Sequence, residues 1–575
     1  MGREARLLRL GTGVVVILMA WAAPTQAGDR DRQDYERLAA ELGTTVPTGA
    51  GARVAQVEVG SSYLPDPSDP DFLSPYKHFV DASGTAGGHS NHPTCVGKRF
   101  YGNETSMAPG IGTSGPEPIL LYEVNDWLGA GYLQTGMDAL PLTTVSRVTN
   151  HGWVGDSARA GEILRRLDFV VEEDDALQLV GVPNSGSCSL PSGAFNVISV
   201  GMTNGSHTSG TVGVDSVYTS GRVAPTVVAM HPTQVSFTVP QVSAACALLL
   251  ETATDASLSS GTTANRTRTI QHAETSEVIK AALMTGADRY VINHAASGDL
   301  TDYAIDTTNN LDSRYGAGQL NIYHSYKILA AGEQDSVQDG GGPRVGTYGW
   351  DYDSTFGGAA GSSRVASYFF TGGESSEAPL VASLVWNIDV DIRLGPGYPR
   401  FFTELHDLDL LLLDVSRGGE TIVASSASAE QNTENLFFEG VVFGRAYELR
   451  VVAGGGQSDF LWDYGLAWRI PEPPTPGDTN RDGEVDFRDY MALKHAFGRS
   501  GDVGWSDGDF DANGCVDRAD FLLLRANFGS GESPSSPVPG PATLWLLGPG
   551  ALLLTRRRRL RWRGNTPSVL DRAAR

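Results

Sequence analysis

The sequence of 575 residues is poor in cysteine and in basic side chains. Its four cysteines are too few for the disulfide framework that holds small secreted domains together. One bridge among Cys95, Cys188 and Cys246 is compatible with an oxidising compartment, but the sequence does not pair them. Lysine and arginine number 43 against 67 aspartates and glutamates, which gives a formal net charge of −24. Because this charge repels phosphates, we expect no nucleic-acid partner.

The length and the composition indicate several domains, and the N-terminus indicates export. Hydrophobic residues make up 41% of the chain, enough for more than one core. The chain opens with "MGREARLLRLGTGVVVILMAWAAPTQAGD", in which arginines precede an apolar run that ends in Thr-Gln-Ala. This order is typical of a secretory signal peptide over residues 1–27, with an uncleaved anchor helix as the alternative.

The chain changes character several times after a short N-terminal segment at 28–51. Residues 52–333 alternate β-like runs such as "FNVISVGM" with helix-like runs such as "SEVIKAALMTGA", which predicts an α/β domain with a largely parallel sheet and flanking helices. Residues 345–470 hold short β-like runs separated by turn signals, which predicts an all-β sandwich. The stiff linker "PEPPTPG" then leads to an acidic repeat region at 477–530.

Two acidic loops in the repeat region predict calcium binding. Each loop, "DTNRDGEVDFRD" and "DFDANGCVDRAD", has oxygen-bearing side chains at positions 1, 3, 5, 9 and 12 and a glycine at position 6. Calcium needs six or more oxygens on a tightly curved loop, and the glycine permits the curve. The expected ligand positions are Asp478, Asn480, Asp482, Glu484, Asp486, Asp489, Asp509, Asp511, Asn513, Cys515, Asp517 and Asp520.

Each acidic loop is followed by an apolar helix-like run, "YMALKHAFG" or "FLLLRANFG". The pair resembles a type I dockerin, a small α-helical module with two calcium loops. The resemblance implies Ca²⁺ as a bound ion and a cohesin-like partner. A calcium-rigidified spacer is the alternative.

The C-terminal segment predicts a location at the cell envelope. Residues 538–559, "VPGPATLWLLGPGALLLTRRRR", combine a Pro-rich motif, an apolar run near bilayer-spanning length and an arginine cluster, and a basic tail follows at 560–575. The segment resembles the PEP-CTERM sorting signal, with Pro-Gly-Pro in place of Pro-Glu-Pro. The resemblance implies an exosortase-type processing enzyme. A plain C-terminal membrane anchor is the alternative, and both make the protein exported, extracellular or envelope-associated.

A candidate nucleophile lies in "HPTQVSFTVPQVSAACALLLE", where Ser236 precedes a proline and a helix of small apolar residues. A serine in this position is also a common helix N-cap. The block resembles the nucleophile motif of subtilisin-like serine peptidases, which carry the acid, the histidine, the oxyanion asparagine and the serine in that order along the chain.

The upstream segments resemble the remaining subtilisin-like motifs in the required order. "VAQVEVG" places Glu58 at the position of the acid, and "GGHSNHPTCVG" places His89 at the catalytic histidine with His92 as the second histidine of the motif. "TNHGWVG" places Gly152 on the substrate-lining strand, and "LVGVPNSGS" places Asn184 at the oxyanion position. The resemblance implies a subtilisin-like fold over 52–333.

The roles follow from the chemistry of peptide hydrolysis. A serine hydroxyl needs a neutral imidazole to remove its proton, and a carboxylate on the other ring nitrogen orients that imidazole. Glu58, His89 and Ser236 are therefore the expected catalytic residues, and Asn184 is the expected donor to the oxyanion. The sequence departs from the family at Gln234-Val235, where Gly-Thr is usual.

Two functions fit these residues. One is an envelope-associated serine endopeptidase that acts on protein or peptide substrates through an acyl-enzyme and needs no cofactor for catalysis. The other is a catalytically inactive subtilisin-like protein that acts as a calcium-dependent binding or scaffolding module. The runs "DLDLLLLDV", "NTENLFFEGV" and "YELRVVA" resemble the prepeptidase C-terminal sandwich of secreted peptidases, which implies an accessory binding or stabilising role, with a structural spacer as the alternative.

Overall fold

A computed structural model describes most of the chain. It covers residues 8–9, 14–16, 33–113, 117–143, 145–289, 300–371, 378–393, 399–416, 418–442, 445–470, 475–480, 484–501, 503–511 and 513–530. The chain divides into the compact units Met1–Ser530 and Gly531–Arg575. The predicted sorting tail, most of the predicted signal peptide and the calcium-ligand candidate Asp482 lie outside the described residues.

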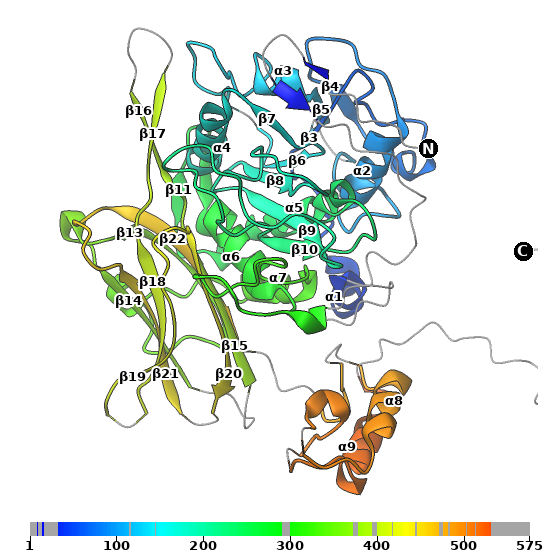
Figure 1. Cartoon of the computed structure of the whole chain (residues 1–575), viewed down its shortest axis with the longest axis vertical. Helices are drawn as coiled ribbons and strands as arrows, with labels where there is room; N and C mark the ends of the chain where they lie inside the picture. The colour runs from blue at the N-terminus through cyan, green and yellow to red at the C-terminus, as the bar shows by residue number, and fades with distance from the viewer. Residues whose placement is uncertain are drawn as a thin grey trace, which may run out of the picture. The chain divides into compact units, whose positions relative to one another are not determined.

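The centre of the first unit is a seven-stranded parallel sheet (Figure 1). In spatial order its strands are β10 (Val227–Ala229), β9 (Ile198–Met202), β8 (Leu177–Gly181), β6 (Val148–His151), β3 (Val54–Glu58), β5 (Ile119–Glu123) and β4 (Phe79–Asp81). Every pairing within it is parallel, and most of its strands are buried along their length, which explains their near-continuous apolar character. The predicted α/β domain with a large parallel sheet is confirmed.

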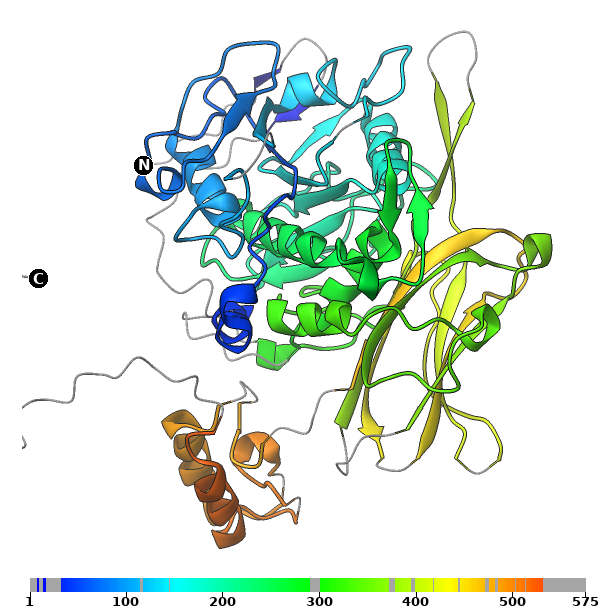
Figure 2. The ribbon, with the colours of Figure 1, turned by 180° about the vertical axis from the view of Figure 1, so that it is seen from behind.

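Helices cover both faces of the parallel sheet and build two hydrophobic cores. The larger core contains residues of α1 (Tyr35–Leu42), α2 (Asn91–Tyr101), α5 (Val239–Ala253), α6 (Ser276–Gly286) and α7 (Ile322–Ala330). The smaller core, on the other face, contains residues of α3 (Val124–Leu128) and α4 (Ala160–Asp174). Figure 2 shows the first group of helices from behind.

Helix α5 is the central helix of the larger core. With the preceding turn it forms the one helix among the described residues, Val235–Ala253, that is long and apolar enough to cross a membrane. However, 89% of that stretch is buried inside the protein. Its alanines and its cysteine, Cys246, let neighbouring helices and strands approach closely, so its apolarity reflects core packing.

Some short strands lie outside the main sheet. The strands β11 (Thr262–Ala264) and β12 (Thr269–Gln271) form a hairpin. The strands β1 (Leu8–Arg9) and β2 (Val14–Val16) belong to the predicted signal peptide; β1 pairs with β2, and β2 pairs with β7 (Gly155–Ser157). All four cysteines are free thiols, so the disulfide bridge that the composition permitted does not form here.

The residues after 345 form two four-stranded antiparallel sheets around a third core. One sheet has the order β13 (Tyr348–Phe356), β22 (Trp462–Arg469), β15 (Ala378–Val385) and β20 (Thr433–Val441). The other has the order β14 (Val365–Thr371), β21 (Ala446–Ala453), β18 (Leu408–Asp414) and β19 (Thr421–Ser426). The predicted antiparallel β region is therefore confirmed.

The antiparallel region packs directly against the α/β region. Trp350 of β13 belongs to the larger core and donates its indole N–H to the carbonyl of Leu329 at 2.9 Å. A hairpin of β16 (Asp389–Arg393) and β17 (Arg400–Glu404) contacts α4, where Phe401 packs edge-on against Phe169 at 5.4 Å between ring centroids. The two regions thus share buried cores, which an accessory domain on a flexible linker would not do.

The acidic repeat region folds as a small pair of helices. They are α8 (Phe487–Ala496) and α9 (Arg518–Asn527), with a core of Val485, Leu493, Ala496, Phe510, Val516 and Leu524. Both helices begin with the same capping box, Asp486 with Asp489 and Asp517 with Asp520. The repeated local structure matches the repeated sequence.

Candidate active site

The candidate site lies at the carboxyl ends of the parallel strands. Glu58 is the last residue of β3, Gly152 directly follows β6, and Asn184 follows β8 by a short loop. Because parallel strands all point the same way, residues that follow them in sequence meet at one edge of the sheet. This is why side chains more than a hundred residues apart in sequence can gather around Ser236.

The structure brings Glu58, His92 and Ser236 into one hydrogen-bonded row. His92 lies in the first turn of α2, with Nδ1 3.1 Å from Glu58 Oε2 and Nε2 3.1 Å from Ser236 Oγ. Glu58 is 2% exposed and Ser236 is 2% exposed, whereas the His92 side chain is 24% exposed. An imidazole that bridges a buried carboxylate and a serine hydroxyl has the geometry of a hydrolytic triad.

This geometry corrects the expectation for the histidine. His89 lies before α2 and is exposed, and its Nδ1 is 2.7 Å from the carbonyl oxygen of Pro65. His92, expected only as the second histidine of the motif, occupies the position between Glu58 and Ser236. The error is one of register, since two histidines three residues apart both fit the His-x-x-His spacing. The start of α2 at Asn91 decides between them, because only His92 is inside the helix.

Ser236 sits in a short 3-10 turn, Val235–Phe237, that continues into α5 with Pro240 in the first turn. Proline is favoured there because the first helical N–H groups lack partners within the helix. The Val235 side chain is fully buried and points toward β8, since a Cβ on Gly181 would lie 2.8 Å from its Cγ1. Val235, which replaces the usual threonine, therefore does not stand in front of Ser236.

The environment of His92 favours its charged form. Burial lowers the pKa of His92, but the charge and the hydrogen bond of Glu58 raise it more, so the pKa lies above its ordinary value. The ring packs against Phe237 at 5.3 Å, and the Arg99 guanidinium lies 4.7 Å from the centre of that phenylalanine ring. The site therefore stabilises the imidazolium form of His92.

Asn184 lies beside the nucleophile. Its Oδ1 accepts a hydrogen bond from the backbone N–H of Val235 at 2.8 Å. Because only the amide oxygen accepts, this bond assigns the orientation of the amide and identifies Nδ2 as the end that would donate to an oxyanion. The structure thus places Asn184 next to the residue that precedes Ser236, as its expected role requires.

The segment before Ser236 is held by His231. Its Nδ1 accepts hydrogen bonds from the backbone N–H groups of Thr233, at 3.3 Å, and Gln234, at 3.1 Å. Burial and the nearby Arg99 lower the pKa of His231 to about 4, so the ring is neutral near pH 7 and Nδ1 is free of a proton. No sequence signal separated this histidine from a surface residue, because its partners are backbone groups.

Two further buried polar residues are hydrogen-bonded in series to Glu58 on the side away from His92. Gln56, two residues earlier on β3 and on the same face of the strand, donates from Nε2 to Glu58 Oε1 at 3.1 Å. The Tyr101 hydroxyl donates to Gln56 Oε1 at 2.7 Å. On the other side, a Cβ added to Gly152 would lie 2.6 Å from both carboxylate oxygens of Glu58. Neither Gln56 nor Tyr101 was identified from the sequence.

Gly152 also takes part in the sheet, since its N–H donates to the carbonyl of Val57 at 2.9 Å. That N–H is therefore engaged by the protein's own backbone. The expected substrate-lining role of Gly152 remains a prediction, and its carbonyl is the group that would serve it.

The acidic loops provide oxygen ligands in both repeats. Carboxylate oxygens of Asp509, Asp511 and Asp520 lie within 4.8 Å of one another. Asp489 and Asp520, at position 12 of each loop, are fully buried and accept backbone N–H groups at 2.7 to 2.9 Å. Oxygen-only donors at these positions fit calcium. Cys515 stands at position 7, where such loops use the backbone carbonyl, so its thiol is not a ligand.

A second acidic group lies where the α/β and antiparallel regions meet. It consists of Glu333, Asp335 and Asp351, with ligand atoms within 4.8 Å of one another. Two of these carboxylates already have protein partners: His272 Nδ1 lies 2.8 Å from Glu333, and the Tyr368 hydroxyl donates to Asp351 at 2.6 Å. Burial holds the pKa of Asp351 well above its usual range. These contacts describe a structural polar cluster.

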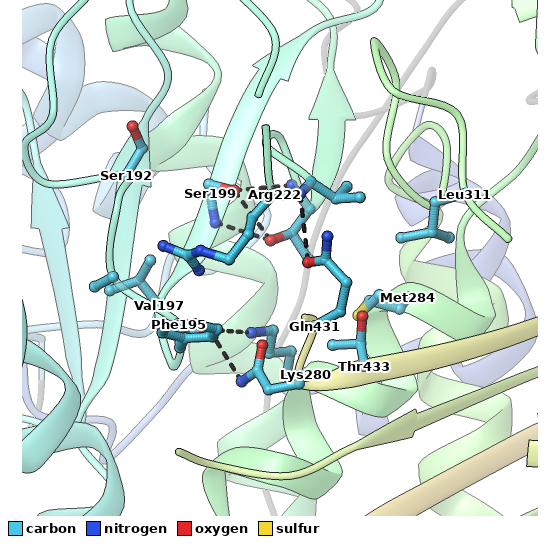
Figure 3. Close-up of a pocket in the computed structure, with 14 residues that line it drawn as sticks. Ser192, Phe195, Val197, Ser199, Arg222, Lys280, Met284, Leu311, Gln431 and Thr433 are labelled. Atoms are coloured by element: carbon cyan, nitrogen blue, oxygen red, sulfur yellow. Dashed lines mark hydrogen bonds between the residues drawn. The ribbon is translucent and has the colours of Figure 1, made fainter. Parts of the chain in front are cut away.

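The described residues also form cavities apart from the candidate triad. The one in Figure 3 is about 30 Å³, with Lys280 donating to the carbonyl of Phe195 at 3.0 Å. It is lined by residues of both the α/β and the antiparallel regions and has room for water only. A larger acidic cleft of about 510 Å³ includes Glu172 and Glu277. Burial and neighbouring carboxylates raise the pKa of Glu172 to about 10.

Comparison with known proteins identifies the acidic repeat region. The family profile of the dockerin type I domain matches residues 476–530, so this segment is a dockerin type I domain. None of the curated proteins compared matches the chain. The match covers a small part of the sequence.

Solved structures show weak likeness to the chain. MycP1 from Mycobacterium smegmatis has a TM-score of 0.31 and 12% identity, over 56% of this chain and 89% of that one. A second structure, titled as a serine protease MycP1 of the type VII (ESX-1) secretion system, has a TM-score of 0.30 and 12% identity, over 56% and 93%. A mitogen from Yersinia pseudotuberculosis has a TM-score of 0.12 and 14% identity, over 19% and 87%. Likeness at this level does not establish a family.

Proposed function

We propose that this chain is an exported, subtilisin-like serine endopeptidase whose catalytic residues are Glu58, His92 and Ser236. The observation that carries the proposal is the position of His92, whose two ring nitrogens lie 3.1 Å from Glu58 Oε2 and 3.1 Å from Ser236 Oγ. Glu58 and Ser236 are buried and His92 is partly exposed at the carboxyl edge of a parallel sheet, where α/β enzymes bind substrates. The order of acid, histidine, asparagine and serine along the chain supports the assignment.

In the proposed reaction Ser236 Oγ attacks the carbonyl carbon of the substrate's peptide bond, and its proton passes to His92 Nε2. Glu58 holds the Nδ1 proton of His92 and stabilises the imidazolium. The negative oxygen of the tetrahedral intermediate accepts from Asn184 Nδ2. As the intermediate collapses, the C–N bond breaks and His92 protonates the leaving amine, which leaves an acyl-enzyme on Ser236. Water then attacks the acyl carbon while His92 Nε2 takes its proton, the bond to Ser236 Oγ breaks, and His92 returns the proton to Oγ as the acid product leaves.

The proposed domain organisation follows the expected boundaries, with a peptidase region over 52–333, a sandwich over 345–470 and the dockerin domain over 477–530. The dockerin domain would bind Ca²⁺ through its two acidic loops, since their buried carboxylates supply only oxygen ligands. It would dock on a cohesin-like partner. Its side chains Phe487, Met491, Phe497, Leu522 and Phe528 are exposed and apolar, which suits a protein surface.

The test is covalent labelling with a fluorophosphonate, which reacts with activated serines. We expect the full-length protein to be labelled and to cleave a denatured protein substrate, and Ser236→Ala to do neither. Ser206→Ala is the matched control, because Ser206 is exposed and away from the triad. Folded wild-type protein that is neither labelled nor active would reject the peptidase and leave the non-catalytic binding module as the function.

A further inference from the structure

The carboxylate of the candidate triad belongs to a glutamate, which lies against Gly152, Gln56 and His92. Glutamate is one methylene longer than aspartate, so its carboxylate reaches further from β3. The carboxylate lies against Gly152, where an added Cβ would be 2.6 Å from each carboxylate oxygen. Separations under 3.0 Å are essentially never seen for a real Cβ, so any side chain at position 152 would displace Glu58.

The backbone gives no other reason for glycine at this position. Gly152 is absent from the glycines of the described chain that have positive φ, so its conformation is open to any residue. Its N–H is bonded to Val57, a contact that every residue except proline can make. The steric demand for glycine therefore comes from the Glu58 carboxylate.

A second demand concerns the carboxylate oxygen that does not face His92. Gln56 Nε2 donates to Glu58 Oε1 and to the carbonyl of Pro93, both at 3.1 Å. Because a carbonyl oxygen only accepts, the bond to Pro93 fixes the orientation of the Gln56 amide. Its oxygen is then the acceptor for the Tyr101 hydroxyl at 2.7 Å.

Tyr101 also packs against a glycine on its way to Gln56. Its ring folds back across α2 over Gly97, where a Cβ would lie 2.4 Å from the hydroxyl oxygen. Gln56 and Tyr101 are both buried, at 1% and 0% exposure. Buried polar groups destabilise a fold unless they are hydrogen-bonded, and these two satisfy each other and Glu58.

We propose that Gly152, Gln56 and Tyr101 are positioning residues that adapt this site to a glutamate. Gly152 provides the space for the longer side chain. The Gln56–Tyr101 pair holds Glu58 Oε1 so that Oε2 faces His92. The proposal rests on the peptidase function for its kinetic consequences. Its steric part, the coupling between residues 58 and 152, does not depend on activity.

The test is a double-mutant cycle between positions 58 and 152 in the full-length protein. We expect Gly152→Ala to lower kcat/KM about 100-fold, because a displacement of about 1 Å in a catalytic group has an effect of this size. In the Glu58→Asp background, which is itself impaired, we expect Gly152→Ala to change kcat/KM by less than about 3-fold, because the shorter carboxylate leaves room. Gly419→Ala is the matched control, since Gly419 is exposed and a Cβ there meets no atom within 4 Å.

The pH dependence of kcat/KM distinguishes a positioning role from a general loss of structure. Glu58 faces His92 from β3 and raises the pKa of His92, while Arg99 and His231 both contact Phe237, the ring that packs against His92. A displaced carboxylate in Gly152→Ala should move the acidic limb of kcat/KM to lower pH. Tyr101→Phe, which keeps the ring, should lower kcat with KM unchanged and should move the limb in the same direction. Loss of activity in these variants without a shift of the limb would overturn the positioning role.

Thermal unfolding of wild type, Gly152→Ala, Glu58→Asp and the double variant tests the steric coupling between residues 58 and 152 without any measurement of activity. We expect Gly152→Ala to lower the unfolding midpoint more in the Glu58 protein than in the Glu58→Asp background, and a Gly152→Ala protein that folds only with Glu58→Asp would support the same conclusion. Equal shifts in both backgrounds would overturn it. If wild-type protein is not labelled at Ser236, the peptidase proposal fails, and this stability cycle still tests whether Gly152 makes room for Glu58.

Discussion

The two histidines three residues apart provide a sharp test of the candidate site. His92→Ala removes the group whose nitrogens lie 3.1 Å from both Glu58 Oε2 and Ser236 Oγ. In serine peptidases, loss of the histidine or of the carboxylate that orients it lowers turnover by about 10⁴ to 10⁶, equivalent to about 5 to 8 kcal/mol of transition-state stabilisation. We expect a loss in this range. His89→Ala, which removes only an exposed ring bonded to the Pro65 carbonyl, should stay within a few-fold of wild type.

The pH dependence adds a second measurement to the same pair. Because Glu58 raises the pKa of His92, the acidic limb of kcat/KM should lie above 6.5, where a free histidine titrates. Below the limb His92 is protonated and cannot accept the Ser236 proton, so activity falls as the pH falls. Glu58→Gln should move the limb to lower pH. Equal losses in His89→Ala and His92→Ala, or a limb unmoved by Glu58→Gln, would refute the assignment of the histidine.

Three further results are expected. Chelation of calcium should unfold the dockerin domain and leave the rest folded, and Asp489→Ala should weaken calcium binding measured by calorimetry, because that buried carboxylate occupies position 12 of the first loop. Phe401→Ala should lower the free energy of unfolding by about 3 to 5 kcal/mol in one denaturant transition shared by the α/β and antiparallel regions, and two separate transitions would contradict the shared core. Glu172, with a folded pKa of about 10 against 4.5 for a free glutamate, contributes stability that is complete below pH 4.5 and is lost as the pH rises toward 10. Glu172→Gln should therefore reduce the fall in unfolding midpoint between pH 5 and pH 8.

Glu58, Asn184 and Ser236 are expected from the ordered resemblance to subtilisin-like motifs. Taken alone, Glu58 is a charge at a strand end and Ser236 is a helix-capping serine. The structure places Glu58 at the end of β3, Asn184 in the loop after β8 and Ser236 in the turn before α5. Their order along the chain therefore carries more information than any single local pattern.

Other parts depend on contacts that no local pattern reports. The choice between His89 and His92 depends on where α2 begins, and helix starts are among the least certain features of a sequence. Gln56 reads as a polar residue inside a strand, and only its contact with Tyr101, 45 positions away, gives it a role. The contact of Phe401 with Phe169 likewise joins residues that the sequence assigns to different domains.

The departures from a usual subtilisin-like site make more physical sense in pairs than singly. Glu58 alone lengthens the acid, but Gly152 supplies the space that the longer side chain needs. Val235 stands where threonine, a residue of nearly the same shape, is usual, and its side chain is buried over β8, where Gly181 leaves room for its Cγ1. Both glycines prevent a clash within the buried core, and such a clash would lower stability whether or not the site is active. The matched pairs therefore explain how the fold accommodates Glu58 and Val235, and labelling of Ser236 decides between a working peptidase and an inactive scaffold.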